Sequence, residues 1–415
     1  MESSVKKAID QWLGSSIDQS DKDTINQLIK DGNETELTDS FYKELEFGTG
    51  GLRGIMGIGP NRMNKYTIGM ATQGLANYLK SVYTNQQISV AIAYDSRNNS
   101  DFFAETTAAV FSANGIKVYL FEELRPTPEL SFAIRHLKCK SGVVITASHN
   151  PKEYSGYKAY WDDGSQIIAP HDTNIIGEVR KISDMSQVNF KADESLIEKI
   201  GLEVDNAYLD AVAQQVLSPE SIKNQSDLSI VFSPIHGTGI TMTPPILKKI
   251  GFKNVHIVEE QSVPDGNFPT VVYPNPEEQE AMAMALAKAQ ELDADLVLAT
   301  DPDADRVGIA VKNSNGEFQL LNGNQTGVLI IYYLCKKWKE NGKLDGNQFI
   351  VKTIVTTELI KDIADSYNID CYDTLTGFKF IAGLIRELEG KKKFIGGGEE
   401  SYGYLIGDSV RDKDA

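Results

Sequence analysis

The most constraining feature of this chain is a pattern that occurs three times: an apolar strand, a helical stretch, a second strand, and a third strand that ends in a polar loop. Strands that alternate with helices form βαβ crossovers and largely parallel sheets, whose ligands lie beyond the carboxyl ends of the strands. The pattern predicts an α/β protein of three consecutive related domains, with mixed, largely parallel sheets around a central cleft. The strands lie at 88–97, 113–121 and 141–151, then 228–239, 249–258 and 294–306, then 347–357, 367–379 and 392–401.

Length and composition agree with this arrangement and limit the partners. A chain of 415 residues suggests about three compact units, which we place at 1–215, 216–320 and 321–415. The net charge of −17 argues against general binding to nucleic acid or anionic membranes. The three cysteines are widely spaced, and the longest apolar run, 328–335, is too short to span a bilayer. We therefore expect a cytoplasmic protein that binds neither nucleic acid nor membrane, and the sequence does not indicate its oligomeric state.

The polar loop of the first unit displays a serine. In V-V-I-T-A-S-H-N-P, 143–151, a buried strand delivers Ser148 to a turn, and a hydroxyl there can act as a nucleophile or carry a phosphoryl group. Taken alone, a Ser-His pair is more often an ordinary turn or helix cap. However, Lys158 follows on what resembles the outgoing strand of a hairpin, where its ammonium can give and take a proton.

The loop of the second unit, T-D-P-D-A-D-R at 300–306, carries three carboxylates. Asp301, Asp303 and Asp305 alternate in a tight turn and can surround a hard divalent cation. An exposed acidic turn is less favourable, because so much negative charge after a buried strand repels itself unless a cation is present. An EF-hand is excluded by its sixth and twelfth positions, which hold neither Gly nor Glu. A haloacid-dehalogenase-type phosphatase with Asp301 as nucleophile stays a competitor, although it leaves the other two loops unexplained.

The remaining candidates bind rather than react. In G-G-G-E-E-S, 396–401, two carboxylates and a hydroxyl follow a flexible backbone and suit sugar hydroxyls, although a plain glycine turn is about as probable. In G-T-G-G-L-R-G, 48–54, Arg53 and backbone amides can meet a phosphate, but this is no Walker motif. Lys379 in T-G-F-K offers an ammonium near the third loop, where a solvated surface lysine is the alternative.

Together, TASHNP, DPDADR and GEES resemble the α-D-phosphohexomutase superfamily, which includes phosphoglucomutase, phosphomannomutase and phosphopentose enzymes. The resemblance runs from about Gly48 to the end of the chain. It implies an intramolecular phosphotransferase with a small phosphosugar substrate, a phosphoserine, a sugar bisphosphate intermediate, and a sugar 1,6-bisphosphate as activator. The implied sites are Ser148 as the phosphorylated residue; Asp301, Asp303 and Asp305 with its phosphate as Mg²⁺ ligands; Lys158 as general acid/base assisted by His149; Arg53, Arg306 and Lys379 as phosphate contacts; and Glu399 and Ser401 as sugar ligands.

Several alternatives stay open on the sequence. Glu400 makes the loop G-E-E-S, which favours interconversion of glucose 1-phosphate and glucose 6-phosphate, but mannose and pentose phosphates are alternatives because epimers differ by one hydroxyl. An Asp-nucleophile phosphatase and a non-catalytic sugar-phosphate-binding protein are the other classes. The family also has a fourth domain with a phosphate-binding loop. We expect that domain to be absent from these 415 residues, with a weaker grip on the far phosphate and slow turnover.

Overall fold

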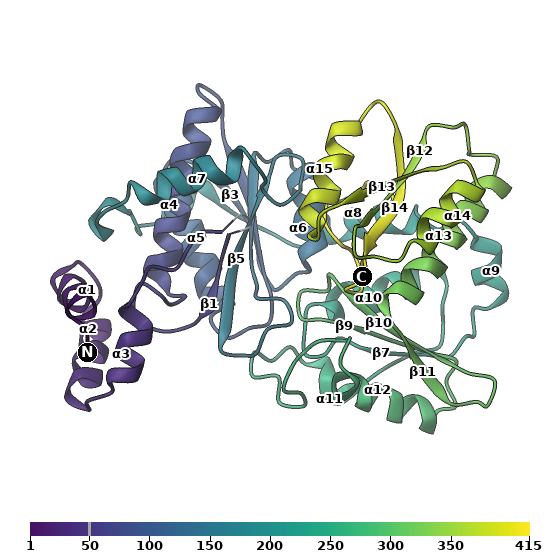
Figure 1. Ribbon diagram of the computed structural model, residues 1–415, viewed down its shortest axis with the longest axis horizontal. Helices are drawn as coiled ribbons and strands as arrows, with labels where there is room; N and C mark the ends of the chain where they lie inside the picture. The colour runs from purple at the N-terminus through teal and green to yellow at the C-terminus, as the bar shows by residue number, and fades with distance from the viewer. Residues whose placement is uncertain (49–50) are drawn as a thin grey trace.

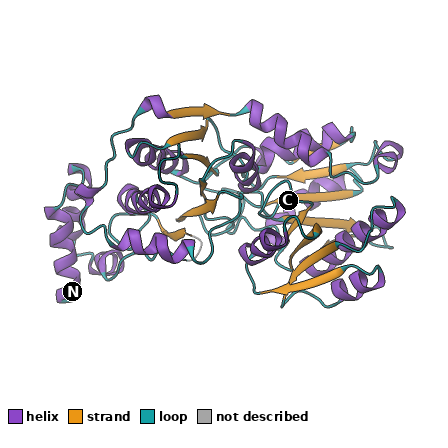
Figure 2. Ribbon diagram, turned by 90° about the horizontal axis from the view of Figure 1, so that it is seen from above, coloured by secondary structure: helices purple, strands orange, loops and turns teal. Residues whose placement is uncertain are grey.

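The computed structural model describes residues 1–48 and 51–415, and in this part of the chain the strands form three sheets of six, five and four strands. In Figure 1 the first unit lies to the left with the N-terminal helices at its far end, and the other two lie one above the other to the right. Viewed from above, helices flank the strands of the units (Figure 2). The predicted fold class, three consecutive α/β units with mixed sheets, is confirmed.

The first unit contains the six-stranded sheet in the order β1-β5-β4-β2-β3-β6. Strands β4, β2, β3 and β6 run parallel, whereas β5 is antiparallel to both β4 and β1. Its elements are α1 (Ser3–Gly14), α2 (Gln19–Lys30), α3 (Glu34–Phe41), β1 (Gly51–Ile55), α4 (Lys65–Val82), β2 (Ser89–Tyr94), α5 (Ser100–Ala113), β3 (Lys117–Phe121), α6 (Thr127–His136), β4 (Ser141–Ile145), β5 (Tyr154–Trp161), α7 (His171–Arg180), the 3-10 turns Met185–Gln187 and Glu194–Leu196, β6 (Ile197–Ile200) and α8 (Leu202–Ala213).

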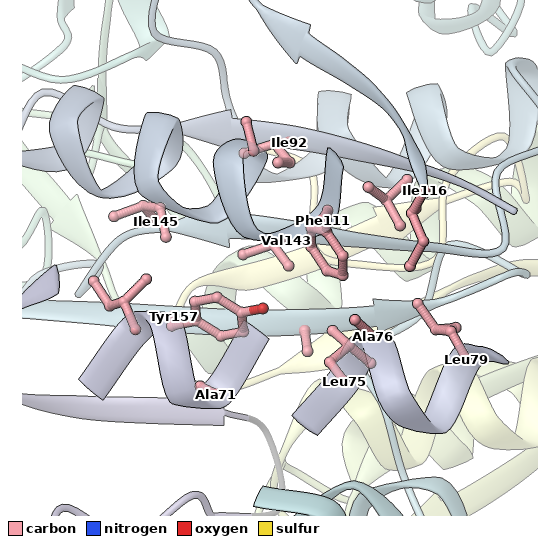
Figure 3. Close-up of a cluster of buried hydrophobic side chains, with 14 of the residues drawn as sticks. Ala71, Leu75, Ala76, Leu79, Ile92, Phe111, Ile116, Val143, Ile145 and Tyr157 are labelled. Atoms are coloured by element: carbon pink, nitrogen blue, oxygen red, sulfur yellow. The ribbon is translucent and has the colours of Figure 1, made fainter. Parts of the chain in front are cut away.

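The core of this unit explains why its strands are rigid enough to present a reactive loop. Helix α4 starts with a capping box in which Asn64 accepts from the amide of Thr67 and the Thr67 hydroxyl accepts from the amide of Asn64. Its buried face packs against the sheet, where Val143 and Tyr157 are completely buried (Figure 3). Each such side chain contributes roughly 1.5–3 kcal/mol when it leaves water. Strand β4 is therefore fixed on both sides up to the point where the polar loop begins.

The second and third units repeat this plan with smaller sheets. The second sheet has the order β11-β10-β9-β7-β8, and the third has the order β13-β12-β14-β15. The elements are α9 (Pro219–Asn224), β7 (Ile230–Ser233), α10 (Gly239–Ile250), β8 (Val255–Ile257), α11 (Glu259–Ser262), α12 (Gln279–Glu291), β9 (Leu296–Thr300), β10 (Val307–Lys312), β11 (Phe318–Leu321), α13 (Gly323–Glu340), β12 (Gln348–Thr353), α14 (Leu359–Ser366), β13 (Asp370–Thr374), α15 (Phe378–Leu388), β14 (Lys393–Glu399) and β15 (Gly403–Ile406).

The polar loops follow three parallel strands at their carboxyl ends: β4, β9 and β14. Contacts across the units bring the first two loops together, and the residues after β15 return to the same place, so that the C-terminus lies where the units meet (Figure 1). Within the described residues, no helix combines the length and the apolar character that a membrane span needs.

Candidate active site

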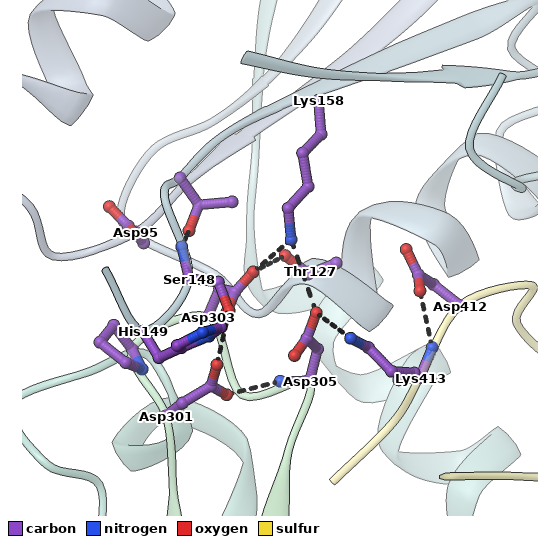
Figure 4. Close-up of polar contacts among 12 residues, drawn as sticks. Asp95, Thr127, Ser148, His149, Lys158, Asp301, Asp303, Asp305, Asp412 and Lys413 are labelled. Carbon is purple, nitrogen blue, oxygen red and sulfur yellow. Dashed lines mark hydrogen bonds and ion pairs between the residues drawn. The ribbon is translucent and has the colours of Figure 1, made fainter. Parts of the chain in front are cut away.

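Ser148 is one of the residues joined by the polar contacts in Figure 4, where it lies beside Asp303. Its φ of 52° is in the left-handed region, which a non-glycine residue adopts at a cost, and its amide donates to Thr146 Oγ1 at 2.8 Å. The Ser148 hydroxyl donates to Asp301 Oδ2 at 2.8 Å, across the boundary between the first and second units. The side chain is almost completely buried. The structure therefore places the predicted nucleophile directly against the predicted metal loop.

The three aspartates form a buried cluster. Asp301, Asp303 and Asp305 each offer a carboxylate oxygen within 4.8 Å of the others, and none is more than 1% exposed. Burial raises the pKa of Asp301, and the neighbouring charges of Asp303 and Asp305 raise it further. Among the described residues, Asp303 Oδ1 and Asp305 Oδ1 are buried and have no hydrogen-bond partner. Oxygens of this kind suit a hard divalent cation, so the cluster fits a metal ion.

Two groups from the first unit hold Asp303. The ammonium of Lys158 on β5 lies 2.8 Å from Asp303 Oδ2 and 3.5 Å from Asp305 Oδ2, and the Thr127 hydroxyl donates to Asp303 Oδ2 at 2.8 Å. Burial lowers the pKa of Lys158, but the two carboxylates outweigh burial and raise it above its ordinary value. Burial raises the pKa of Asp303, and the charge of Lys158 outweighs burial, so that this carboxyl stays ionised.

His149 and Arg306 flank this cluster. The Nδ1 atom of His149 lies 3.1 Å from the Ser148 hydroxyl. Burial and then the charge of Arg306 lower the pKa of His149 to about 4, so the imidazole is neutral at pH 7. The amide of Arg306 donates to Asp301 Oδ1 at 3.1 Å, while its guanidinium pairs with Glu277 and approaches Asp305 Oδ1 at 3.8 Å. A neutral imidazole is suited to exchange a hydrogen bond with the serine hydroxyl.

The other predicted residues lie outside this contact network. Arg53 is exposed on β1, and its Nη1 donates to Asn150 Oδ1 at 3.4 Å; Thr49 and Gly50 of its loop fall outside the described residues. Glu399 is buried and accepts from the amide of Gly377 at 2.7 Å. Ser401 follows β14 and is half-buried. Lys379, near the start of α15, is half-buried with its ammonium 5.1 Å from the Phe380 ring centre.

The structure adds residues that the sequence reasoning missed. Lys413 places its ammonium 3.2 Å from Asp305 Oδ2, Thr127 binds Asp303, and Arg97 contacts the carbonyl of Ser148. Asp412 accepts from the Tyr160 hydroxyl at 2.6 Å. One signal was available: D-S-R at 95–97 stands at the carboxyl end of a parallel strand, where ligands and functional groups gather.

Comparisons with known proteins agree with this geometry. The chain matches phosphoglucomutase/phosphomannomutase alpha/beta/alpha domain I over 44–186, domain II over 206–316 and domain III over 322–415. It is 38% identical over 375 residues to a phosphoglucomutase from Staphylococcus haemolyticus, covering 90% of this chain and 67% of that protein. It is 37% identical over 394 residues to one from Staphylococcus aureus, covering 94% of this chain and 70% of that protein.

A solved structure, a putative phosphomannomutase from Thermus thermophilus, superimposes with a TM-score of 0.71 at 26% identity. The superposition covers 90% of this chain and 77% of that one. The boundaries predicted at 215 and 320 stay predictions. The matches to three successive family domains and the two relatives show that this chain belongs to the phosphoglucomutase/phosphomannomutase family of the α-D-phosphohexomutases.

Proposed function

We propose that the protein interconverts glucose 1-phosphate and glucose 6-phosphate through a phosphoserine at Ser148. The observation that carries this proposal is the hydrogen bond from the Ser148 hydroxyl to Asp301, inside a buried cluster that also holds Asp303, Asp305 and Lys158. Phosphoryl transfer depends mainly on positioning and on neutralising charge, and this cluster offers both. The relatives named phosphoglucomutase support glucose phosphate as the substrate.

The metal proposal follows from the oxygens that lack a hydrogen-bond partner. Asp301, Asp303 and Asp305, together with the phosphate on Ser148, would hold Mg²⁺, which would neutralise the negative charge of the transferring phosphoryl group. The hydrogen bonds from the amides of Asp305 and Arg306 to Asp301 Oδ1 fix the turn of this loop. Backbone hydrogen bonds of the loop thus hold Asp301 in position before any metal binds.

In the proposed cycle, Ser148 gives its phosphoryl group to a sugar hydroxyl and later takes back the other phosphate. In the first half, the P–O bond to Ser148 Oγ breaks, a P–O bond to the sugar forms, and the proton of the sugar hydroxyl ends on Ser148 Oγ: the Lys158 ammonium gives a proton to the serine oxygen and takes the sugar's proton in exchange. The resulting sugar 1,6-bisphosphate turns around, its other phosphate passes to Ser148, and the serine proton reaches the freed sugar oxygen by the same exchange at Lys158. His149 assists at the serine oxygen, from which its Nδ1 is 3.1 Å away.

The remaining residues are proposed to bind the sugar and its phosphate. The guanidinium of Arg53 contacts Asn150 of the Ser148 loop, that of Arg306 approaches Asp305 of the metal loop, and such groups match phosphate oxygens in geometry. Glu399 and Ser401 would bind sugar hydroxyls, and Lys379 the substrate phosphate. The cytoplasmic location and the lack of nucleic-acid or membrane partners stay predictions.

The competing phosphatase chemistry is less well supported. It requires Asp301 to attack phosphorus with a free carboxylate oxygen. However, Asp301 Oδ2 accepts from Ser148, and Asp301 Oδ1 accepts from two backbone amides. Oδ1 is therefore turned toward the backbone of its own loop, and Oδ2 serves as the acceptor for the Ser148 hydroxyl, which is the arrangement expected when the serine is the nucleophile.

Rates on three substrates test the proposed function. Purified protein with Mg²⁺ and a catalytic amount of glucose 1,6-bisphosphate should convert glucose 1-phosphate with a kcat/KM about tenfold or more above that for mannose 1-phosphate and ribose 1-phosphate. Donors and acceptors of the sugar site that pair with the hydroxyls of one sugar lack a partner when another sugar binds, and this weakens binding. A higher value on mannose or ribose 1-phosphate would reassign the substrate, and release of inorganic phosphate without isomerisation would replace the mutase with a phosphatase.

A further inference from the structure

The guanidinium of Arg97 lies beneath the loop that carries Ser148. Arg97 follows strand β2 and is only 3% exposed. Its Nη2 donates to the carbonyl of Ser148 at 2.6 Å and to the carbonyl of Asn150, and its Nη1 donates to the carbonyls of Pro151 at 2.8 Å and Tyr154 at 3.0 Å. Four backbone oxygens of one loop thus converge on a single cation.

Arg97 is itself held from its own unit and from the second unit. Its Nε lies 3.4 Å from Asp95 Oδ2, while the other Asp95 oxygen accepts from the amide of Arg97 at 2.9 Å and from the Ser100 hydroxyl at 2.7 Å. From the second unit, the Phe268 ring faces the guanidinium, with its centre 5.1 Å away. A planar guanidinium fixed at both edges cannot move without moving the loop.

The backbone conformation of Ser148 shows why the contacts of Arg97 with this loop matter. Ser148 has a φ of 52°, a conformation that non-glycine residues adopt only when the surroundings hold them there. The Arg97 contact is made to the carbonyl of Ser148 itself, so it restrains the backbone from which the hydroxyl projects toward Asp301. Loss of the contact would let this residue relax and displace the Ser148 hydroxyl. A misplacement of about 1 Å can cost about 100-fold in rate.

We propose that Arg97 is a positioning residue for phosphoryl transfer: through four loop carbonyls it keeps the Ser148 hydroxyl in the orientation that accepts and releases a phosphoryl group. Asp95 orients Arg97 for this task. The inference rests on the proposed role of Ser148. It predicts an effect on the transfer step, with little effect on the binding of the sugar phosphate or of the metal, since Arg97 donates to backbone oxygens of the Ser148 loop.

The test compares Arg97→Lys with a matched control, Arg62→Lys. Arg62 is also 3% exposed and lies in the first unit, but it pairs with Glu36 and Asp39. Lysine keeps the charge but cannot reach four carbonyls at once. R97K should slow the single-turnover transfer from glucose 1,6-bisphosphate to Ser148 about 100-fold, with the KM for glucose 1-phosphate and the Kd for Mg²⁺ within about threefold of wild type. R62K should lower Tm and leave the transfer rate unchanged.

A second variant guards against misfolding of R97K. Asp95→Asn keeps the shape of the side chain and removes the negative charge that faces Arg97, so it should slow transfer about tenfold. Wild-type transfer rates in both R97K and D95N, or an equal effect of R97K and R62K on transfer, would overturn the proposal. If the wild-type protein itself fails to phosphorylate Ser148, the proposed function fails, which is a different result from unaltered transfer in the variants.

Discussion

Replacing Ser148 with alanine should reduce the conversion of glucose 1-phosphate to glucose 6-phosphate by roughly 10⁴-fold or more, since removal of a covalent nucleophile typically has effects of this size. The hydroxyl that donates to Asp301 is the atom proposed to carry the phosphoryl group. Its loss leaves the carboxylate cluster in place but removes the phosphoryl donor of the first half of the cycle and the acceptor of the second. The measurement is the steady-state rate with Mg²⁺ and a glucose 1,6-bisphosphate primer.

Ser155→Ala is the matched control for this variant. Ser155 is a buried serine on the neighbouring strand β5, and its hydroxyl has no hydrogen-bond partner among the described residues. We expect S155A to keep its rate within about twofold of wild type, because the change removes no contact to the cluster. If S148A retains more than about a tenth of the wild-type rate, Ser148 is not the phosphoryl carrier.

The second large effect is expected from Asp303→Asn, which should weaken Mg²⁺ binding at least about 100-fold and reduce kcat to a similar extent. Substitution of a residue that only contacts a metal ligand already lowers metal affinity or activity about 10–100-fold. Asp303 is proposed to bind the metal itself, so a larger effect is expected. The change also removes the negative charge that lies 2.8 Å from the ammonium of Lys158. Calorimetric titration with Mg²⁺ and kcat at saturating Mg²⁺ measure the two effects.

Asp293→Asn controls for loss of a carboxylate in the same unit. Asp293 is exposed and pairs with Lys312, away from the cluster. This variant should bind Mg²⁺ as wild type does, because Asp293 is not part of the cluster, and it should keep its fold, because surface ion pairs contribute little to stability. Wild-type turnover of D303N in the presence of EDTA would show that the metal assignment is wrong.

The sequence alone was sufficient where the signal was local. Ser148 and the three aspartates follow apolar strands, so the sequence places each group at the carboxyl end of a strand in its own sheet, where ligands bind. The two loops meet because the units pack with these ends facing one cleft. The repeated strand and helix pattern likewise predicted the three α/β units.

Contacts between distant segments were not predictable in this way. Lys413 reaches Asp305 because the chain returns to the junction of the units after β15, and no motif marks that return. The position of Arg97 just after strand β2 was a signal, but its partners are backbone carbonyls, which side-chain patterns do not identify. The two glutamates of G-E-E-S also have different partners, which the sequence does not indicate. Glu400 Oε2 accepts from the hydroxyls of Thr353 and Thr356 in its own unit, and Glu399 accepts from the amide of Gly377.

The most direct test of the account is to locate the phosphoryl group by mass spectrometry after incubating the wild-type protein with glucose 1,6-bisphosphate and Mg²⁺. An oxygen ester on serine survives acid, whereas an aspartyl phosphate is cleaved by hydroxylamine. We expect one acid-stable phosphate on the peptide that contains Ser148, lost in the S148A variant. A hydroxylamine-labile phosphate on the peptide that contains Asp301, with none on Ser148, would contradict it.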